Sequence, residues 1–303
     1  MRLSDLLGNL PAVLTRLGPD VDVKAIRADS RHVRRGDLFI AIPGVHVDGH
    51  RFIGEAVRKG ASAVIGERPS ERVNAPAGEG FTYVRVLNAR EAWGWACAAW
   101  EGFPSREMAL VGVTGTDGKT TTVSLIHGIL TAAGVRTGIV STVQAIIPVA
   151  DTQEGAMRAV ETGLHTTTPD PPEIQRYLAQ MVSGGATHAA LEVTSHGLTQ
   201  HRVAGCDFDV AAVTNITHEH LDFHGSLTAY RRAKAKLFEG LCGSFRKQGI
   251  PKTAVLNGDD EARQSLNWYN YGLATTVAED KIVALWTGIE SFVELDEQDF
   301  DES

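Results

Sequence analysis

The chain has 303 residues, of which 43% are hydrophobic and 22% are charged, and its formal net charge is −8. This composition is typical of a folded globular protein and excludes a disordered chain. At this length we expect about two domains. The chain holds three cysteines and no CxxC pair. A disulfide framework and a Cys-rich zinc site are therefore not expected, and a reducing cytoplasm fits.

The negative charge is concentrated at the end of the chain. Segment 290–303 contains seven acidic residues and no Lys or Arg, so the rest of the chain is nearly neutral. We expect this segment to be a solvated acidic tail. Because no broad basic face is indicated, a nucleic-acid partner is not expected. The sequence also contains no run of ~18 apolar residues, so we expect no membrane span, and its start has no apolar core typical of a secretory signal.

The first part of the chain reads as one α/β unit, from 1 to 107. Its predicted elements are, in order, a strand over 37–42, a helix over 52–59, a strand over 61–65, a loop over 67–80 and a helix over 89–100. Trp93 and Trp100 lie on one face of the last helix and are expected to pack in the core. Segment 102–106 contains Gly and Pro and predicts a linker.

From 108 to 289 the pattern changes to alternating strands and helices. The predicted strands are 108–113, 137–143, 188–193, 210–215 and 253–257, and the predicted helices are 121–133, 172–183 and 229–241. The apolar strands are of the kind that is buried on both faces of a parallel sheet. This repetition predicts an open, doubly wound, mostly parallel sheet.

A glycine-rich loop follows the strand 108–113 and precedes a helix. The loop reads Gly115-x-x-Gly118-Lys119-Thr120. Glycines allow backbone N–H groups to surround phosphate oxygens, and the helix N-terminus adds partial positive charge. Lys119 can reach the β- and γ-phosphates, and the Thr120 hydroxyl can ligate Mg²⁺. The generic Walker A pattern has glycine where this chain has Val113, so the loop is a variant.

Acidic and histidine residues cluster after two later strands. Glu192 ends a strand, where ligands bind in an open α/β sheet, and seven of the eleven histidines lie between His165 and His224. The spacing contains no HExxH and no nearby Cys, so Mg²⁺ bound through phosphates fits better than zinc. The segment from Tyr230 to Phe238 predicts a basic amphipathic helix. From the spacing alone, its charged face could equally be a solvated surface with no part in a site.

Six motifs occur together and in order. They are Asp29-Ser-Arg-x-Val-x-x-Gly-Asp-Leu-Phe, Thr114-Gly-Thr-Asp-Gly-Lys-Thr-Thr, Thr167-Thr-Pro, Glu192-Val-Thr-Ser-His-Gly-Leu-x-Gln-His-Arg, Asn215-Ile-Thr-x-Glu-His-Leu-Asp-Phe-His-Gly and Tyr230-x-x-Ala-Lys-x-x-Leu-Phe. Over residues 20–270 the chain resembles the ATP-dependent Mur ligases of peptidoglycan synthesis. Within that family it is most similar to the MurE group, which adds the third residue of the peptide.

The resemblance implies a domain plan. Residues 1–107 would form a small UDP-muramoyl substrate-binding domain, and 108–289 a P-loop-type central domain that binds ATP. Family members also have a C-terminal Rossmann-like domain that closes over ATP and selects the amino acid. We find no match to its opening motif, Leu-Pro-Gly-x-Phe-Asn, or to its selecting motif, Asp-Asn-Pro-Arg. We therefore expect this domain to be absent from the chain.

The resemblance also implies roles for individual residues. The ATP-binding residues would be Gly115, Thr116, Asp117, Gly118, Lys119, Thr120 and Thr121, with Asn257 near the adenine. Two Mg²⁺ ions would be held by Thr120 and Glu192, and by His220 and a carbamate formed from CO2 on Lys234, with Lys236 as the competing lysine. The residues that grip the UDP-muramoyl peptide would be Ser30, Thr167, Thr168, Thr194, Gln200 and Arg202. Lys119, Glu192, His220 and Lys234 would be catalytic.

The implied activity is that of an ADP-forming acid–amino-acid ligase. It would join an amino acid to UDP-N-acetylmuramoyl-L-Ala-D-Glu through an acyl phosphate, as a cytoplasmic monomer whose partners are small molecules. Without the third domain the chain could be inactive alone. Two alternatives stay open: a non-catalytic protein that binds nucleotide and UDP-muramoyl peptide, and another Mur or folylpolyglutamate-type ligase.

Overall fold

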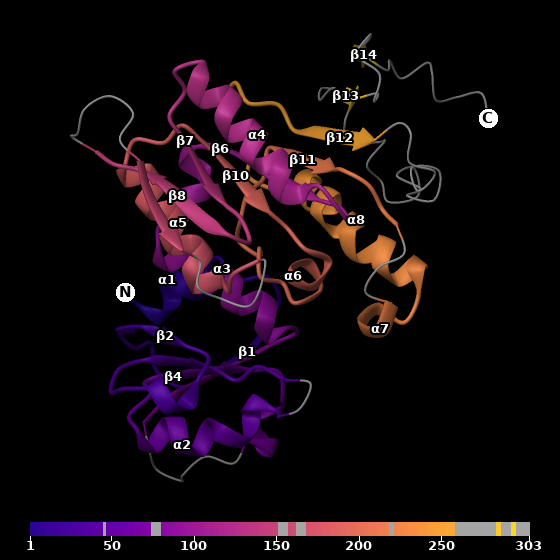
Figure 1. The fold of residues 1–303 in the computed structure, drawn as a ribbon. Coiled ribbons are helices and arrows are strands. Elements are labelled where there is room, and N and C mark those ends of the chain that lie inside the picture. Colours follow the sequence, from indigo (N-terminus) through magenta and orange to yellow (C-terminus); the bar gives the residue numbers. More distant parts are fainter. Residues whose placement is uncertain are drawn as a thin grey trace. The chain divides into compact units, whose positions relative to one another are not determined.

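The computed structural model describes residues 1–44, 47–73, 80–150, 157–161, 168–217, 221–257, 283–285 and 292–294. The chain forms two compact units, each with its own sheet (Figure 1). The first contains Met1–Phe103 and the short segment Gln200–Gly205, and the second contains Pro104–Thr199 and Cys206–Ser303. In the described part of the chain, none of the helices has both the length and the apolar character needed to cross a membrane.

The first unit is a five-stranded sheet with helices. Its helices are α1 (Leu3–Leu7), α2 (Ile53–Arg58) and α3 (Ala89–Trp100), and its strands are β1 (Val13–Leu17), β2 (Ile26–Arg27), β3 (Leu38–Ile40), β4 (Ala63–Gly66) and β5 (Thr82–Val86). Short 3-10 turns lie at Ser30–His32, Gly49–Phe52 and Ser70–Arg72. The strand order is β1-β5-β4-β3-β2, in which β1 pairs antiparallel with β5 and the other pairs are parallel.

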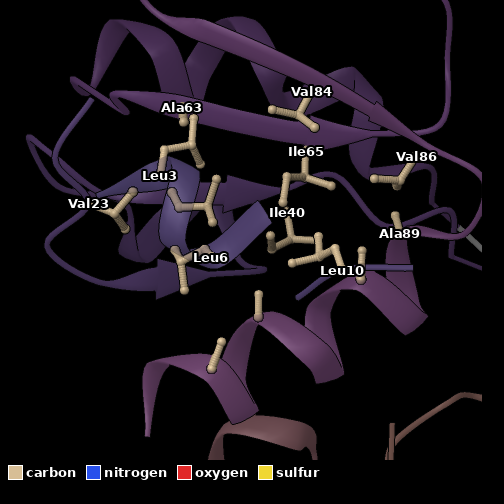
Figure 2. Packing of buried hydrophobic residues seen from close by; sticks show 14 residues of the cluster. Leu3, Leu6, Leu10, Val23, Ile40, Ala63, Ile65, Val84, Val86 and Ala89 are labelled. Atoms are coloured by element: carbon tan, nitrogen blue, oxygen red, sulfur yellow. The ribbon is translucent and has the colours of Figure 1, made fainter. Parts of the chain in front are cut away.

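Alternating strand residues fill two cores, one on each face of this sheet. On one face Ile40 and Ile65 pack with Leu3 and Leu6 of α1 and with the alanines of α3 (Figure 2). On the other face Phe39 and its neighbours pack against α2. This period of two explains why the short central strands are buried on both sides.

Helix α3 has the bounds predicted from the sequence. Its N-terminus is set by Asn88, whose Oδ1 accepts hydrogen bonds from the N–H groups of Arg90 (3.0 Å) and Glu91 (3.1 Å). Such a side chain satisfies N–H groups that have no partner within the helix. Trp93 and Trp100 pack against the first core, as predicted.

The second unit is built on a nine-stranded sheet. Its strands are β6 (Ala109–Thr114), β7 (Thr137–Val140), β8 (Gln144–Pro148), β9 (Met157–Glu161), β10 (His188–Glu192), β11 (Val210–Val213), β12 (Thr253–Asn257), β13 (Val283–Leu285) and β14 (Phe292–Glu294). Its helices are α4 (Lys119–Ala132), α5 (Pro171–Ser183), α6 (Ser195–Thr199), α7 (Leu221–His224) and α8 (Leu227–Gly243), after a 3-10 turn at Pro104–Glu107.

The strand order is β14-β13-β12-β11-β6-β10-β7-β8-β9. The pairs from β13 to β7 are parallel, and antiparallel strands extend the sheet at both edges. The prediction of an α/β fold with a mostly parallel, doubly wound sheet is therefore confirmed. Strands β6, β10 and β11 are neighbours, so their carboxyl ends meet at one edge of the sheet.

Some predicted bounds differ from the observed ones. The strand predicted over 137–143 ends at Val140, because Ser141 begins a turn in which its N–H and its hydroxyl both donate to the carbonyl of Gln144. The last helix begins before Ala229, because the Ser226 hydroxyl accepts a hydrogen bond from the Ala229 N–H and starts the helix at Leu227. Strand β14 lies within the predicted acidic tail, and the rest of that tail lies outside the described residues.

A buried charge cluster joins the segments that precede the parallel strands. Asp209 is fully buried and accepts hydrogen bonds from the Leu110 N–H (2.8 Å), from Lys252 Nζ (3.0 Å) and from Lys247 Nζ. Burial lowers the pKa of Lys247, and the Asp209 carboxylate opposes that shift. The cluster thus fixes the start of β6 against the start of β11.

We predict that Asp209→Asn will lower the free energy of unfolding of the second unit by about 3–5 kcal/mol, because two buried ammonium groups lose their counter-charge. Urea unfolding followed by tryptophan fluorescence and circular dichroism measures the change. Asp22→Asn is the control, since that carboxylate is exposed and its ion pair contributes little. A loss no larger than that of the control would contradict the prediction.

Candidate functional site

The loop between β6 and α4 (residues 115–118, the phosphate loop) is the segment that the sequence predicts to bind phosphate. Gly115 and Gly118 have φ values of +147° and +78°, which residues with a side chain rarely adopt. A Cβ atom on Gly115 would lie 1.8 Å from Thr214 Oγ1. The loop therefore requires glycine at 115 for two reasons, its backbone angle and the close approach of the neighbouring segment.

The segment after β11 holds this loop in place. The Asn215 carbonyl accepts from the Thr116 N–H (2.8 Å), and Asn215 Oδ1 accepts from the Asp117 N–H (2.9 Å). The Thr214 hydroxyl donates to the Asp117 carbonyl (2.6 Å). Asn257, at the end of β12, donates in turn to the Thr214 carbonyl (2.7 Å). Three neighbouring strands thus contribute to the shape of the loop.

The start of α4 and one lysine make the loop electropositive. The first N–H groups of a helix have no partner within the helix and carry partial positive charge. Lys119, the first residue of α4, donates from Nζ to the carbonyls of Gly115 (3.1 Å) and Thr116 (2.7 Å). Its ammonium group is therefore held inside the loop. This combination is suited to binding an anion.

A buried carboxylate lies next to this anion site. Glu192, at the end of β10, is 2% exposed. Its Oε2 accepts from the Thr120 hydroxyl (2.8 Å) and from the Thr142 N–H (3.0 Å). The two side chains are 72 positions apart in sequence, yet their oxygens are adjacent. A hydroxyl and a carboxylate oxygen beside a phosphate site are the ligand types that Mg²⁺ prefers.

Two threonines lie beside Glu192. The Thr168 hydroxyl contacts the Glu192 carbonyl (3.3 Å) and the Thr194 hydroxyl (2.9 Å), and it accepts from the Thr194 N–H (3.0 Å). The Thr194 hydroxyl also accepts from the Gly197 N–H (3.0 Å) and so caps α6. Both threonines therefore contribute to the local structure beside Glu192.

Helix α8 also contacts the phosphate loop. Lys234 is 2% exposed, and its Nζ donates to the Gly115 carbonyl (2.5 Å) and lies 4.5 Å from the centre of the Tyr230 ring. The Tyr230 and Thr116 hydroxyls are 3.1 Å apart. Lys236, the competing lysine, is half-buried. Thus Lys234, and not Lys236, is the lysine whose contact with the loop is seen.

Two family models match the chain. Residues 113–299 match the Mur ligase middle domain, and residues 22–100 match the Mur ligase family catalytic domain. The chain belongs to the Mur ligase family. The resemblance seen in the motifs is therefore confirmed, and the phosphate loop, Glu192 and α8 all lie within the Mur ligase middle domain.

Curated Mur ligases are similar in sequence to this chain. The UDP-N-acetylmuramoyl-L-alanyl-D-glutamate–2,6-diaminopimelate ligase of Geobacillus kaustophilus is 42% identical over 87% of this chain and 50% of its own length. The UDP-N-acetylmuramyl-tripeptide synthetase of Deinococcus radiodurans is 41% identical over 93% of this chain and 54% of its own. The chain thus spans about half the length of the curated relatives it matches.

Solved structures agree on the fold. A UDP-N-acetylmuramoyl-L-alanyl-D-glutamate–2,6-diaminopimelate ligase superposes with a TM-score of 0.65 at 27% identity, and the match covers 89% of this chain and 50% of that one. MurF from Acinetobacter baumannii, at 19% identity, gives a TM-score of 0.54 over 96% of this chain and 60% of that one. The second likeness concerns the fold alone.

The predicted site residues of this Mur ligase chain lie in the second unit, in the first unit or outside the described residues. The phosphate loop, Glu192, Thr168, Thr194, Lys234 and Asn257 lie in the second unit and are linked by the contacts above. Ser30, Gln200 and Arg202 lie in the first unit. Ser30 Oγ donates to Glu55 (3.2 Å), and Gln200 Oε1 accepts from Arg202 Nε (3.1 Å).

Thr167 and His220 lie outside the described residues. Within the described ranges no cluster of three or more His, Cys, Asp or Glu side chains forms a metal site. Three residues that shape the loop, Thr214, Asn215 and Tyr230, were not among the predicted site residues. Asn215 and Tyr230 each begin one of the six motifs, and this could have indicated that they belong to the site.

We predict that Gly115→Ala will lower the free energy of unfolding of this Mur ligase chain by about 1–3 kcal/mol, from an unfavourable φ and a clash with Thr214. Gly128→Ala is the matched control. A Cβ there meets nothing within 4 Å, and alanine favours the middle of helix α4, so a slight gain is expected. Thermal and urea unfolding measure both. Equal behaviour of the two variants would refute the role given to Gly115.

Proposed function

We propose that this chain is the nucleotide- and UDP-muramoyl-peptide-binding portion of an ATP-dependent, ADP-forming peptide ligase of the MurE type. Its reaction joins an amino acid to UDP-N-acetylmuramoyl-L-Ala-D-Glu. The observation that carries the proposal is the phosphate loop with Lys119 inside it and the Thr120–Glu192 pair beside it, in a Mur ligase middle domain. The names of the curated relatives support the substrate and the product.

The loop fits the phosphates of ATP. The N–H groups at the start of α4 would face the anion, whereas those of Thr116 and Asp117 donate to Asn215. Lys119 would exchange its bonds to loop carbonyls for bonds to phosphate oxygens. Because Asn215 and Thr214 already hold the loop, little ordering is needed when the nucleotide binds. Catalysis of phosphoryl transfer rests mainly on such positioning and charge stabilisation. Asn257 supports the loop through Thr214 and is proposed to lie near the adenine.

The oxygens beside the loop fit Mg²⁺. The Thr120 hydroxyl and Glu192 would hold one ion, and His220 with a carbamate on Lys234 would hold a second. Bound Mg²⁺ neutralises charge that gathers on the phosphoryl oxygens during transfer. As an ammonium group Lys234 cannot be a metal ligand. Carbamylation replaces that positive charge with a carboxylate-like oxygen donor, which a hard metal ion accepts.

The remaining predicted residues are proposed to bind the UDP-muramoyl peptide. The hydroxyls of Thr168 and Thr194 lie close to Glu192, and Thr167 precedes Thr168 in the sequence. Arg202, oriented by Gln200, supplies a planar cation suited to a carboxylate or a phosphate. Ser30 is proposed to contact the uridine nucleotide.

The proposed reaction has two steps. The terminal glutamyl carboxylate of the substrate attacks the γ-phosphorus of ATP, so an O–P bond forms, the bond to the β-phosphate oxygen breaks and ADP leaves. The neutral amine of the incoming amino acid then attacks the acyl carbon. The C–N bond forms, inorganic phosphate leaves and the amine releases a proton. All three substrates are charged small molecules, and we propose that the chain meets them in the cytoplasm as a monomer.

Mass spectrometry of the purified chain tests the proposal. It is incubated with ATP, Mg²⁺, bicarbonate, UDP-N-acetylmuramoyl-L-Ala-D-Glu and a panel of diaminopimelate, lysine and ornithine. A tripeptide product supports ligase activity, and its mass identifies the amino acid. ATP and UDP-dipeptide binding without product supports the second candidate, a non-catalytic binding protein. Absence of both binding and product contradicts the proposal.

We predict that Lys119→Ala will weaken ATP binding at least tenfold while changing the free energy of unfolding little. The reason is that the ammonium group forms charge-assisted hydrogen bonds to the phosphates and does not pack in the hydrophobic core. Isothermal titration calorimetry with a non-hydrolysable ATP analogue measures the binding. Lys236→Ala, a half-buried lysine on α8, is the control and should bind normally. Unchanged affinity in the Lys119 variant would be evidence against the phosphate site.

We predict that Glu192→Gln will raise the Mg²⁺ concentration needed for half-maximal ATP-analogue binding by about tenfold or more, because a charged oxygen ligand becomes neutral. Titration of Mg²⁺ at fixed nucleotide measures it. Glu173→Gln, on α5, controls for the loss of one negative charge. The same Mg²⁺ requirement in both variants would exclude Glu192 as a ligand.

A further inference from the structure

One buried hydroxyl next to the phosphate loop is not accounted for by the fold. Thr114 ends β6 and is 0% exposed. Its backbone carbonyl accepts from the Thr214 N–H (3.0 Å), but its Oγ1 has no hydrogen-bond partner in the part of the chain that the structure describes. A buried hydroxyl without a partner costs free energy, so such a group calls for a partner that binds there.

The alternation of side chains along β6 shows which way Thr114 faces. Val111 and Val113 pack with Val123 on the face covered by α4. Gly112 faces the other side, where a Cβ would lie 2.9 Å from Leu237 Cδ1 of α8. Thr114 is the next residue on that side, because side chains two positions apart share a face. It therefore faces α8 and not α4.

Helix α8 runs antiparallel to β6 at this place. Leu237 lies beside Gly112, Lys234 donates to the carbonyl of Gly115 (2.5 Å), and the Tyr230 hydroxyl lies 3.1 Å from that of Thr116. Position 114 falls between the first two of these contacts. Thr114 is thus opposite the turn of α8 that carries Lys234.

We propose that Thr114 is a positioning residue whose hydroxyl donates a hydrogen bond to a carbamate oxygen on Lys234. The inference rests on the proposed function, in which Lys234 is carbamylated. A carbamate has two oxygens. If one were a metal ligand, the other would require a hydrogen-bond donor beside the buried Lys234 side chain. The Thr114 hydroxyl is a buried donor on the matching side of β6.

The lone pair of the neutral Lys234 Nζ forms a bond to the carbon of CO2, and one C=O electron pair moves onto oxygen. The nitrogen then releases a proton to solvent and leaves a carbamate with one negative charge. A hydrogen bond to a charged acceptor is stronger than one between neutral groups. Thr114 therefore shifts the carbamylation equilibrium toward the modified side chain.

The test is carbon-13 NMR of the full chain in [¹³C]bicarbonate at fixed pH. The carbamate signal is assigned to Lys234 by its loss in Lys234→Arg. We expect Thr114→Val to raise the bicarbonate concentration for half-maximal signal about tenfold, as for loss of one hydrogen bond to a charged group. Thr114→Ser, which keeps the hydroxyl, should stay within about twofold of wild type. Thr137→Val is the control, because Thr137 is equally buried but its hydroxyl donates to Val135.

The outcomes separate this inference from the proposed function. A wild-type carbamate that is unchanged in Thr114→Val overturns the positioning role and leaves the proposed function intact. Equal losses in Thr114→Val, Thr114→Ser and Thr137→Val also overturn it, since they indicate a packing effect. Absence of the carbamate signal from wild type contradicts both. Unfolding curves of all variants confirm that each is folded at the temperature used.

Discussion

The site depends on the hydrogen bonds between the phosphate loop and the segment that follows β11. Thr214 and Asn215 hold the loop through both backbone and side-chain groups, and Gly115 gives them room to approach. The loop conformation is thus imposed by a neighbouring strand. A loop that already has its binding shape loses less conformational entropy when an anion arrives.

The order of the strands brings the other groups to this loop. β6 lies between β10 and β11, so Glu192 at the end of β10 and Asn215 beyond β11 reach the loop from opposite sides. Helix α8 adds Lys234 and Tyr230 from the face opposite α4. A cation, a carboxylate and helix N–H groups are therefore combined at one sheet edge, where ligands bind in folds of this kind.

Much of this arrangement could be predicted from the sequence, since its signals are local. The loop is marked by Gly115, Gly118 and Lys119, and the apolar strand before Glu192 placed that carboxylate at the same sheet edge. The links of Thr116 to Tyr230 and of Asp117 to Asn215 join residues about a hundred positions apart, so spacing alone did not indicate them. The antiparallel strands β8 and β9 were missed because their extended state depends on pairing, of β8 with β7 and of β9 with β8.

The buried contact of Asp209 with Lys247, Lys252 and the Leu110 N–H has a consequence for the distant end of the same strands. A strand advances by a nearly constant length per residue. Fixing where β6 and β11 start therefore also fixes which of their residues lie side by side further along. The ion cluster therefore sets the register between β6 and β11. In this register Thr114 and Val213 lie side by side, so Thr214 lies level with the loop that it supports.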